Sequence, residues 1–198
     1  MKYKHIIFDF GNVLGIFDED DILSHFFYNK ADFPVLKKAI FENWKALDAG
    51  AIDYEENITH AVSLVPDHLK ESVRSFFQDW NKYLTPLTQT WELVRELKDK
   101  GYSLYILSNA SVNFAEHASQ YDITKEFDGI VFSAVIQMLK PNPNIYQHLF
   151  DTYHLDPSEC FFIDDLEENI AAARNLGMDG IVFTGNINAV KDAIGIGK

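Results

Sequence analysis

The sequence predicts an α/β fold, a doubly wound parallel sheet with a small, all-helical cap domain. After Pro86, short apolar segments typical of strands alternate with amphipathic segments typical of helices. Between about residues 20 and 80, by contrast, the apolar residues recur with helical spacing alone. An apolar strand-like segment at residues 3–10 precedes this helical region, so we expect the sheet to begin before it and to resume after it.

These boundaries predict two domains. Residues 1–14 and 86–198 would form the α/β core, and residues 15–85 would form a cap inserted after the first strand. Parallel sheets are normally covered by helices on both faces, and their ligands bind at the carboxyl ends of the strands. We therefore expect the cap over those strand ends, and the chemistry between the cap and the sheet.

The elements follow from the apolar spacing in chain order. The segment Y-K-H-I-I-F-D-F is rich in β-branched and aromatic residues, which is typical of a buried strand. The core resumes with a helix that ends at Gly101, where glycine suits the left-handed conformation of a helix end. Strands are then expected at residues 102–107, 129–132, 160–163 and 181–183, and helices at about 112–119, at about 144–153 and before 177.

The composition restricts the partners. Seventeen basic and 30 acidic residues give a formal charge of −13, which argues against nucleic acids and anionic membranes as partners. The sequence contains no apolar run near the ~20 residues that cross a bilayer and no signal-peptide pattern. A lone cysteine, Cys160, fits a reducing compartment, so we expect a cytoplasmic protein. The sequence selects no oligomeric state.

Polar residues gather where four of the expected strands end: Asp9, Ser108 with Asn109, Lys140, and Asp164 with Asp165. An acid at the end of a buried apolar strand is costly without a partner, which makes Asp9 the most informative of them. No Walker A sequence and no G-x-G-x-x-G accompanies these residues, so a nucleotide site of either kind is not supported.

Each motif also has a purely structural explanation. Asp165 and Glu168 fit a capping box at a helix start. Ser108 and Asn109 fit a cap or a turn, and Lys140 fits a solvated loop position. Their occurrence together at the strand ends favours a shared site.

The chemistry of such a site would be phosphoryl transfer. Three converging carboxylates, from Asp9, Asp164 and Asp165, are hard oxygen ligands suited to Mg²⁺, and they repel one another unless a cation neutralises them. Lys140 and Ser108 would bind the remaining phosphoryl oxygens. An aspartate is an accepted nucleophile for this reaction and forms an aspartyl-phosphate.

The order of these motifs resembles the haloacid dehalogenase-like superfamily over nearly the whole chain. Its members have a first strand ending in D-x-D-x-(T/V), a second ending in Ser or Thr, a lysine, and an acidic pair. The phrases L-S-N-A, K-P-N-P-N-I-Y and F-I-D-D-L-E-E-N are similar to the branch of sugar-phosphate phosphatases and the phosphatase-like domain of soluble epoxide hydrolase. The resemblance implies a Rossmann-like core with a helical cap and a Mg²⁺-dependent phosphohydrolase for a small phosphorylated metabolite, such as a sugar phosphate.

The resemblance also implies roles for single residues. Catalysis is assigned to Asp9, Ser108 and Lys140, metal binding to Asp9, the Gly11 carbonyl, Asp164 and Asp165, and substrate binding to Asn12 and Asn109.

One position departs from the family pattern. Two residues after the nucleophile, relatives carry an aspartate that protonates the leaving group, whereas this chain has Gly11. We therefore expect hydrolysis to depend steeply on leaving-group pKa, unless a cap acid such as Asp18, Glu19 or Asp20 replaces it. Gly11→Asp would restore the carboxylate only if the backbone there tolerates a side chain.

Two other functions stay open. A dehalogenase needs no general acid, although the acidic pair would then have no purpose in a metal-free displacement. A non-catalytic phosphate-binding protein on the same fold is the second alternative.

Overall fold

The computed structural model describes residues 2–197, and its core contains a five-stranded parallel sheet in the order β5-β4-β1-β6-β7. Its strands are β1 (His5–Phe8), β4 (Ser103–Ser108), β5 (Gly129–Phe132), β6 (Cys160–Asp164) and β7 (Asp179–Val182). In the central strand, Ile6, Ile7 and Phe8 are completely buried, as expected for a strand with helices on both sides. The predicted parallel α/β sheet is confirmed.

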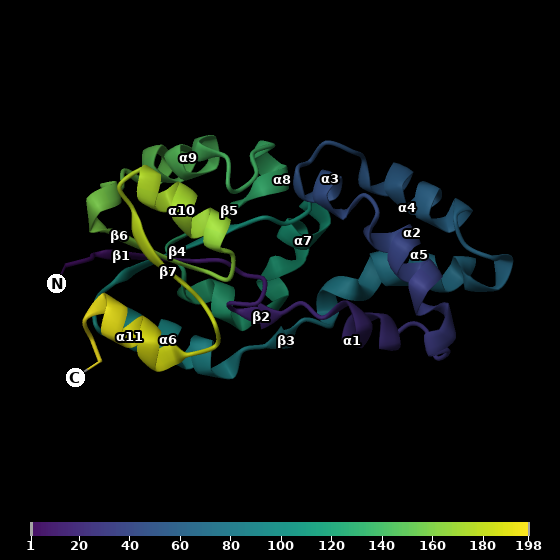
Figure 1. The fold of residues 1–198 in the computed structure, drawn as a ribbon, viewed down its shortest axis with the longest axis horizontal. Helices are drawn as coiled ribbons and strands as arrows, with labels where there is room; N and C mark the ends of the chain where they lie inside the picture. Colours follow the sequence, from purple (N-terminus) through teal and green to yellow (C-terminus); the bar gives the residue numbers. More distant parts are fainter. Residues whose placement is uncertain (1, 198) are drawn as a thin grey trace.

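The two faces of the sheet are covered by different helices. Figure 1 shows α9 (Pro143–Tyr153) and α10 (Glu167–Asn175) on one side, and α6 (Thr88–Asp99) and α11 (Ile187–Ile194) on the other. Alternate residues of β1 point to opposite faces, so Ile6 and Phe8 join the apolar cluster under α6 and α11. Ile7 joins the cluster under α9 and α10.

The sequence-based expectations omitted two helices of the core, the four-residue α8 (Ser133–Ile136) and α11. They ended the chain on a strand at residues 181–183, whereas β7 is followed by α11. The Asn186 side chain accepts from the Ala189 amide at the start of α11, and Val190 and Ile194 are buried. The apolar pattern of α11 was too short to recognise, because the helix has only eight residues.

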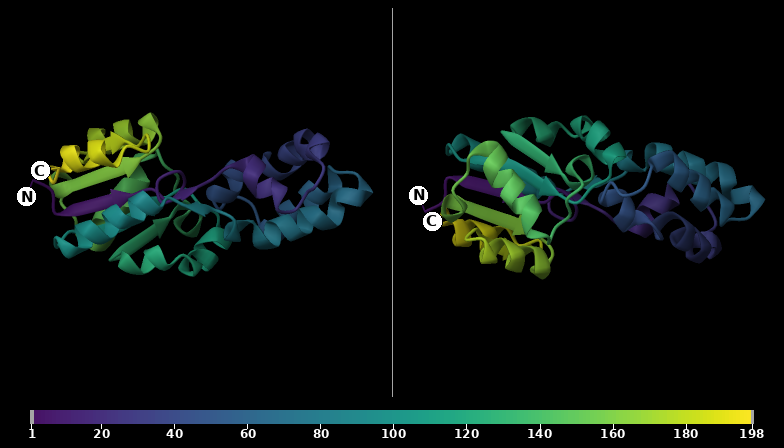
Figure 2. Two further views of the ribbon diagram at one scale, coloured as in Figure 1. Left: turned by 90° about the horizontal axis from the view of Figure 1, so that it is seen from below. Right: turned by 90° about the horizontal axis from the view of Figure 1, so that it is seen from above.

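The regular structure between β1 and α6 is mainly helical. It contains α1 (Glu19–Ser24), α2 (Phe33–Phe41), α3 (Trp44–Asp48), α4 (Tyr54–Ser63) and α5 (Lys70–Asp79). These helices lie together at the end of the molecule opposite the termini (Figure 2). Between residues 2 and 197, the structure contains no helix with both the length and the apolar character needed to cross a bilayer.

The chain enters and leaves this helical segment through a short antiparallel ribbon. Gly15 and Ile16 of β2 (Gly15–Ile16) pair with β3 (Thr85–Pro86). The boundaries at residues 15 and 85 stay a prediction, which the position of this ribbon supports. We keep the name cap for residues 15–85.

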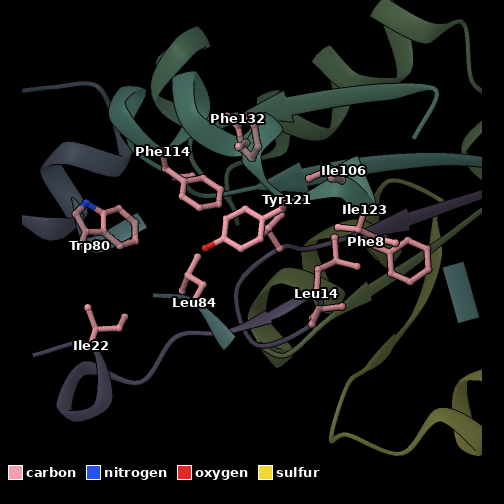
Figure 3. Close-up of a cluster of buried hydrophobic side chains, with 14 of the residues drawn as sticks. Phe8, Leu14, Ile22, Trp80, Leu84, Ile106, Phe114, Tyr121, Ile123 and Phe132 are labelled. Carbon is pink, nitrogen blue, oxygen red and sulfur yellow. The ribbon is translucent and has the colours of Figure 1, made fainter. Parts of the chain in front are cut away.

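An apolar contact joins the cap to the core beside the strand ends. Trp80 follows α5 and stacks on Phe114 of α7 (Val112–His117), with ring centroids 5.8 Å apart. Figure 3 shows Trp80 and Leu84 facing Phe114 and Tyr121. The Asn81 carbonyl also accepts a hydrogen bond from the Tyr121 hydroxyl. One continuous apolar cluster therefore spans both parts of the molecule.

The cap has an interior of its own, which a substitution can test. Phe76 is fully buried and packs against Phe26, Phe41 and Phe77. We expect Phe76→Ala to lower the free energy of unfolding by about 3–5 kcal/mol, because it leaves a cavity. In the control Leu64→Ala, at a position that is 40% exposed, we expect a change below about 0.5 kcal/mol. Urea unfolding measures both, and equal losses would contradict this description of the cap.

Candidate active site

Asp9 follows β1 directly and lies at the carboxyl edge of the sheet. Its backbone amide donates to the Ile163 carbonyl at 2.9 Å, which continues the ladder between β1 and β6. Its side chain accepts from the Phe10 amide at 2.7 Å and from Lys140 Nζ at 3.0 Å. Burial raises the pKa of Asp9 to about 6, although Lys140 and the Ser108 hydroxyl favour the charged form.

Lys140 lies between two buried carboxylates. Its Nζ is 2.6 Å from Asp164 Oδ2 and 3.0 Å from Asp9 Oδ1, and its side chain is 1% exposed. Burial alone would lower the pKa of Lys140, but Asp9 and Asp164 raise it above its ordinary value. The Asn109 side chain fixes the Lys140 backbone, accepting from its amide at 2.8 Å and donating to its carbonyl at 3.0 Å. The ammonium group is therefore charged and held in place.

The two acids at the end of β6, Asp164 and Asp165, lie in different environments. Asp164 is completely buried, and its Oδ1 accepts from the Leu166 amide and from Asn169 Nδ2, both at 2.9 Å. Asp165 is half-buried and accepts from Asn12 Nδ2 at 3.2 Å. Burial raises the pKa of Asp165, and the neighbouring Asp164 adds to the rise.

The contacts of Asp165, Ser108, Asn109 and Lys140 do not match the purely structural roles of cap, turn or solvated loop residue. Asp165 caps no helix: α10 begins after Leu166, whose amide bonds to Asp164 instead. The side chain that caps α7 belongs to Ser111, not to Ser108 or Asn109. Lys140 is buried, which excludes the solvated loop position.

The carboxylates of Asp9, Asp164 and Asp165 meet the basic requirement of a metal site. One oxygen from each lies within 4.8 Å of the other two. Three carboxylates and one ammonium group carry a net charge of −2, so a divalent cation would neutralise the cluster. Asn169 lines the same cavity, and its buried Oδ1 has no hydrogen-bond partner among the described residues. These oxygen donors fit Mg²⁺.

The two residues assigned to substrate binding, Asn12 and Asn109, both make hydrogen bonds within the protein. Asn12 has a φ of 55°, in the left-handed region that asparagine tolerates, and its side chain contacts both Asp165 and the Phe17 amide. Asn109 is occupied by the Lys140 backbone. Both contacts favour positioning over substrate recognition.

A cavity of about 380 Å³ lies between the strand ends and the cap. Asp9, Ser108 and Lys140 line it from the core. The cap and the neighbouring α7 contribute mainly apolar side chains: Phe17, Trp44, Trp80, Leu84 and Phe114. A charged group would bind at the sheet edge, and the rest of a ligand would contact aromatic rings.

Two polar residues in this cavity, Asn169 and Asp48, received no role from the sequence, although Asn169 ends the phrase F-I-D-D-L-E-E-N. Asn169 is the fifth residue after Asp164 and bonds to it, but a single asparagine near a helix start is common. Asp48 is the last residue of α3 and comes from the cap. Nothing about its spacing distinguishes it from the other cap acids.

Known proteins are similar to this chain in sequence and in fold. Sesquiterpene phosphatase astK of Aspergillus oryzae is 27% identical over 150 residues, which cover 74% of each chain. D-ribitol-5-phosphate phosphatase of Bacteroides thetaiotaomicron is 24% identical over 191 residues, 89% of each chain. The fold is similar to the HAD family enzyme bt-2542 of the same organism, crystallised with magnesium and inorganic phosphate. That comparison has a TM-score of 0.72 at 24% identity and covers 93% of this chain and 96% of that chain.

A sequence profile extends these similarities from single relatives to a family. The profile of the haloacid dehalogenase-like hydrolases matches residues 3–177, from the start of the first strand segment to the turn after α10. This match covers most of the chain and includes Asp9, Ser108, Lys140 and the two acids at positions 164 and 165. The chain therefore belongs to the haloacid dehalogenase-like hydrolases, a family of enzymes, and phosphatases are among the chain's relatives.

Proposed function

We propose that the protein is a Mg²⁺-dependent phosphohydrolase that acts on a small phosphorylated metabolite through an aspartyl-phosphate on Asp9. The observation that carries this proposal is the position of the Asp9 carboxylate, which lines the cavity 3.0 Å from a buried ammonium group. A nucleophile beside a fixed positive charge is the arrangement that phosphoryl transfer needs.

The core residues have separate roles in this reaction. Asp9 attacks phosphorus, while Lys140 and Ser108, which also line the cavity, bind the phosphoryl oxygens. Asp164 holds Lys140 at 2.6 Å and does not line the cavity itself. Asn109 fixes the backbone of the same lysine, so we assign it a positioning role.

Asp9, Asp165 and the Gly11 carbonyl would hold the magnesium ion, as the family resemblance implies. The contacts of Asp164 with Lys140, Leu166 and Asn169 support an indirect role for that carboxylate, through water. When bound, the ion supplies charge neutralisation for the phosphoryl oxygens and the acidic cluster.

The cavity supports a substrate of modest size with an apolar or CH-rich face. Trp44, Trp80 and Phe17 can contact either a carbon chain or the face of a sugar ring. The two similar phosphatases are named for a sesquiterpene and for D-ribitol 5-phosphate, which represent these two chemistries. A panel of phosphorylated sugars, polyols and prenyl alcohols would identify the class.

Substitution of the nucleophile tests the proposed reaction. We expect Asp9→Asn to lower phosphate release from p-nitrophenyl phosphate by on the order of 10³-fold or more, because the amide cannot attack phosphorus. Excess chelator should abolish turnover in the unmodified protein, and added Mg²⁺ should restore it. Substantial turnover by the variant would favour direct attack by water. Halide release from a 2-haloacid without phosphate release would favour a dehalogenase, and neither activity would favour a binding protein.

Substitutions can separate the roles of the two acids at the end of β6. Asp165→Ala should abolish activity and Mg²⁺ binding, measured by calorimetry, while leaving metal-free stability nearly unchanged, because Asp165 is half-buried. Asp164→Asn should instead lower the free energy of unfolding by roughly 3–5 kcal/mol, because it breaks a buried ion pair with Lys140. The two variants serve as controls for each other. Full turnover by Asp165→Ala, or unchanged stability of Asp164→Asn, would contradict these assignments.

A further inference from the structure

Asp48 is the one carboxylate that the cap contributes to the cavity, among the residues that the structure describes. It ends α3 and lines the cavity together with Asp9, Ser108 and Lys140. It does not belong to the acidic cluster at the strand ends, which contains Asp9, Asp164 and Asp165. Asp48 therefore reaches the cavity from the cap, whose side chains would contact the part of a phosphate ester beyond its phosphoryl group.

The position of Asp48 is fixed by contacts between the cap and the core. Its backbone carbonyl accepts from Ser133 Oγ at 2.5 Å, and Ser133 is completely buried. Two residues later, Gly50 has a φ of +62°, and a Cβ there would lie 2.4 Å from the Ala134 carbonyl oxygen. The Gly50 carbonyl also accepts from Gln137 Nε2 at 3.4 Å. This corner of the cap is thus docked on residues 133–137 of the core.

The surroundings of Asp48 favour its protonated form. Burial, followed by the charge of Asp9, raises the pKa of Asp48 to about 7, although Lys140 and the Ser111 backbone amide oppose the rise. A carboxylic acid of that pKa is a suitable proton donor near neutral pH.

The three cap acids that the sequence suggested are occupied elsewhere. Asp18 accepts from the Asp21 amide at 3.0 Å and caps α1. Glu19 and Asp20 form ion pairs with Lys37 at 3.1 and 2.9 Å. None of the three lines the main cavity.

We infer that Asp48 is the general acid of the proposed reaction and supplies from the cap the carboxyl group that position 11 lacks. This inference rests on the proposed function. Asp9 attacks phosphorus, the bond from phosphorus to the ester oxygen breaks, and that oxygen takes its electron pair and the Asp48 proton. Water then attacks the aspartyl-phosphate and gives its proton to the Asp48 carboxylate. The products are an alcohol and inorganic phosphate, and both aspartates return to their starting forms.

The test compares two leaving groups in the Asp48→Asn variant. For an alkyl phosphate such as glycerol 3-phosphate, kcat/KM should fall by about 10²–10⁴-fold, because the alkoxide leaves unprotonated. For 2,4-dinitrophenyl phosphate it should fall by less than about tenfold, because that leaving group needs no proton. Since kcat/KM ends at the first irreversible step, the later attack by water does not enter the comparison. Asp20→Asn, the matched control, should leave both values unchanged.

A second variant restores the acid at its usual place. A Cβ at Gly11 would meet nothing within 4 Å, and φ there is not in the left-handed region, so Gly11→Asp is sterically allowed. Combined with Asp48→Asn, it should recover alkyl phosphate hydrolysis at least tenfold, within the range of general acid catalysis. This recovery would not occur if Asp48 only held the cap in place.

The outcomes that overturn the inference are distinct from a failure of the proposed function. Equal losses on both substrates would make Asp48 a docking residue, and no loss on either would remove it from the reaction. If Asp48→Asn does not fold, the unmodified protein still tests the inference. A general acid in the cavity makes kcat/KM depend only weakly on leaving-group pKa, so a steep dependence would refute the role of Asp48. Absence of phosphate release from either substrate by the unmodified protein would instead refute the proposed function.

Discussion

The ion cluster around Lys140 is the interaction on which the candidate site depends. Among residues 2–197, the most deeply buried charged side chains are those of Asp9, Lys140 and Asp164, and the two acids meet at one ammonium group. Breaking a buried pair of this kind costs several kcal/mol, because it leaves a charge without a partner. The cluster therefore fixes the ends of β1 and β6 and the loop before α9 relative to one another. It also places a positive charge where a protein of charge −13 has to bind an anion.

The two parts of the molecule contribute different chemistry to the cavity. The core provides the charges and hydrogen-bond donors that a phosphoryl group requires, from residues at the ends of rigid strands. The cap provides aromatic side chains and Asp48, which would contact the leaving group. The cap is packed on the core through Trp80 and Phe114 and docked near Ser133, and these contacts hold its side chains beside the strand ends. Substrate choice would then depend on the cap.

The strand-end rule made most of the site predictable. Parallel strands bring their carboxyl ends to one edge, so Asp9, Ser108 and Lys140 could be placed together without any coordinates. The pattern did not separate Asp164 from Asp165, because their difference lies in burial and in contacts with Lys140 and Asn12. Asp48 was unpredictable for a similar reason: its role depends on how α3 docks on the core, which no local spacing encodes. The short helix α11 was missed because its helical spacing of Ile187, Val190 and Ile194 extends over only eight residues.

Trapping the phosphorylated enzyme tests the central claim most directly. During turnover in Mg²⁺, the protein would be denatured rapidly and reduced with borohydride, which converts an aspartyl-phosphate to homoserine. Peptide mass spectrometry then locates the modified position. The account predicts homoserine at position 9, and none in the presence of chelator. Steady phosphate release without modification, or modification of another aspartate, would contradict Asp9 as the nucleophile.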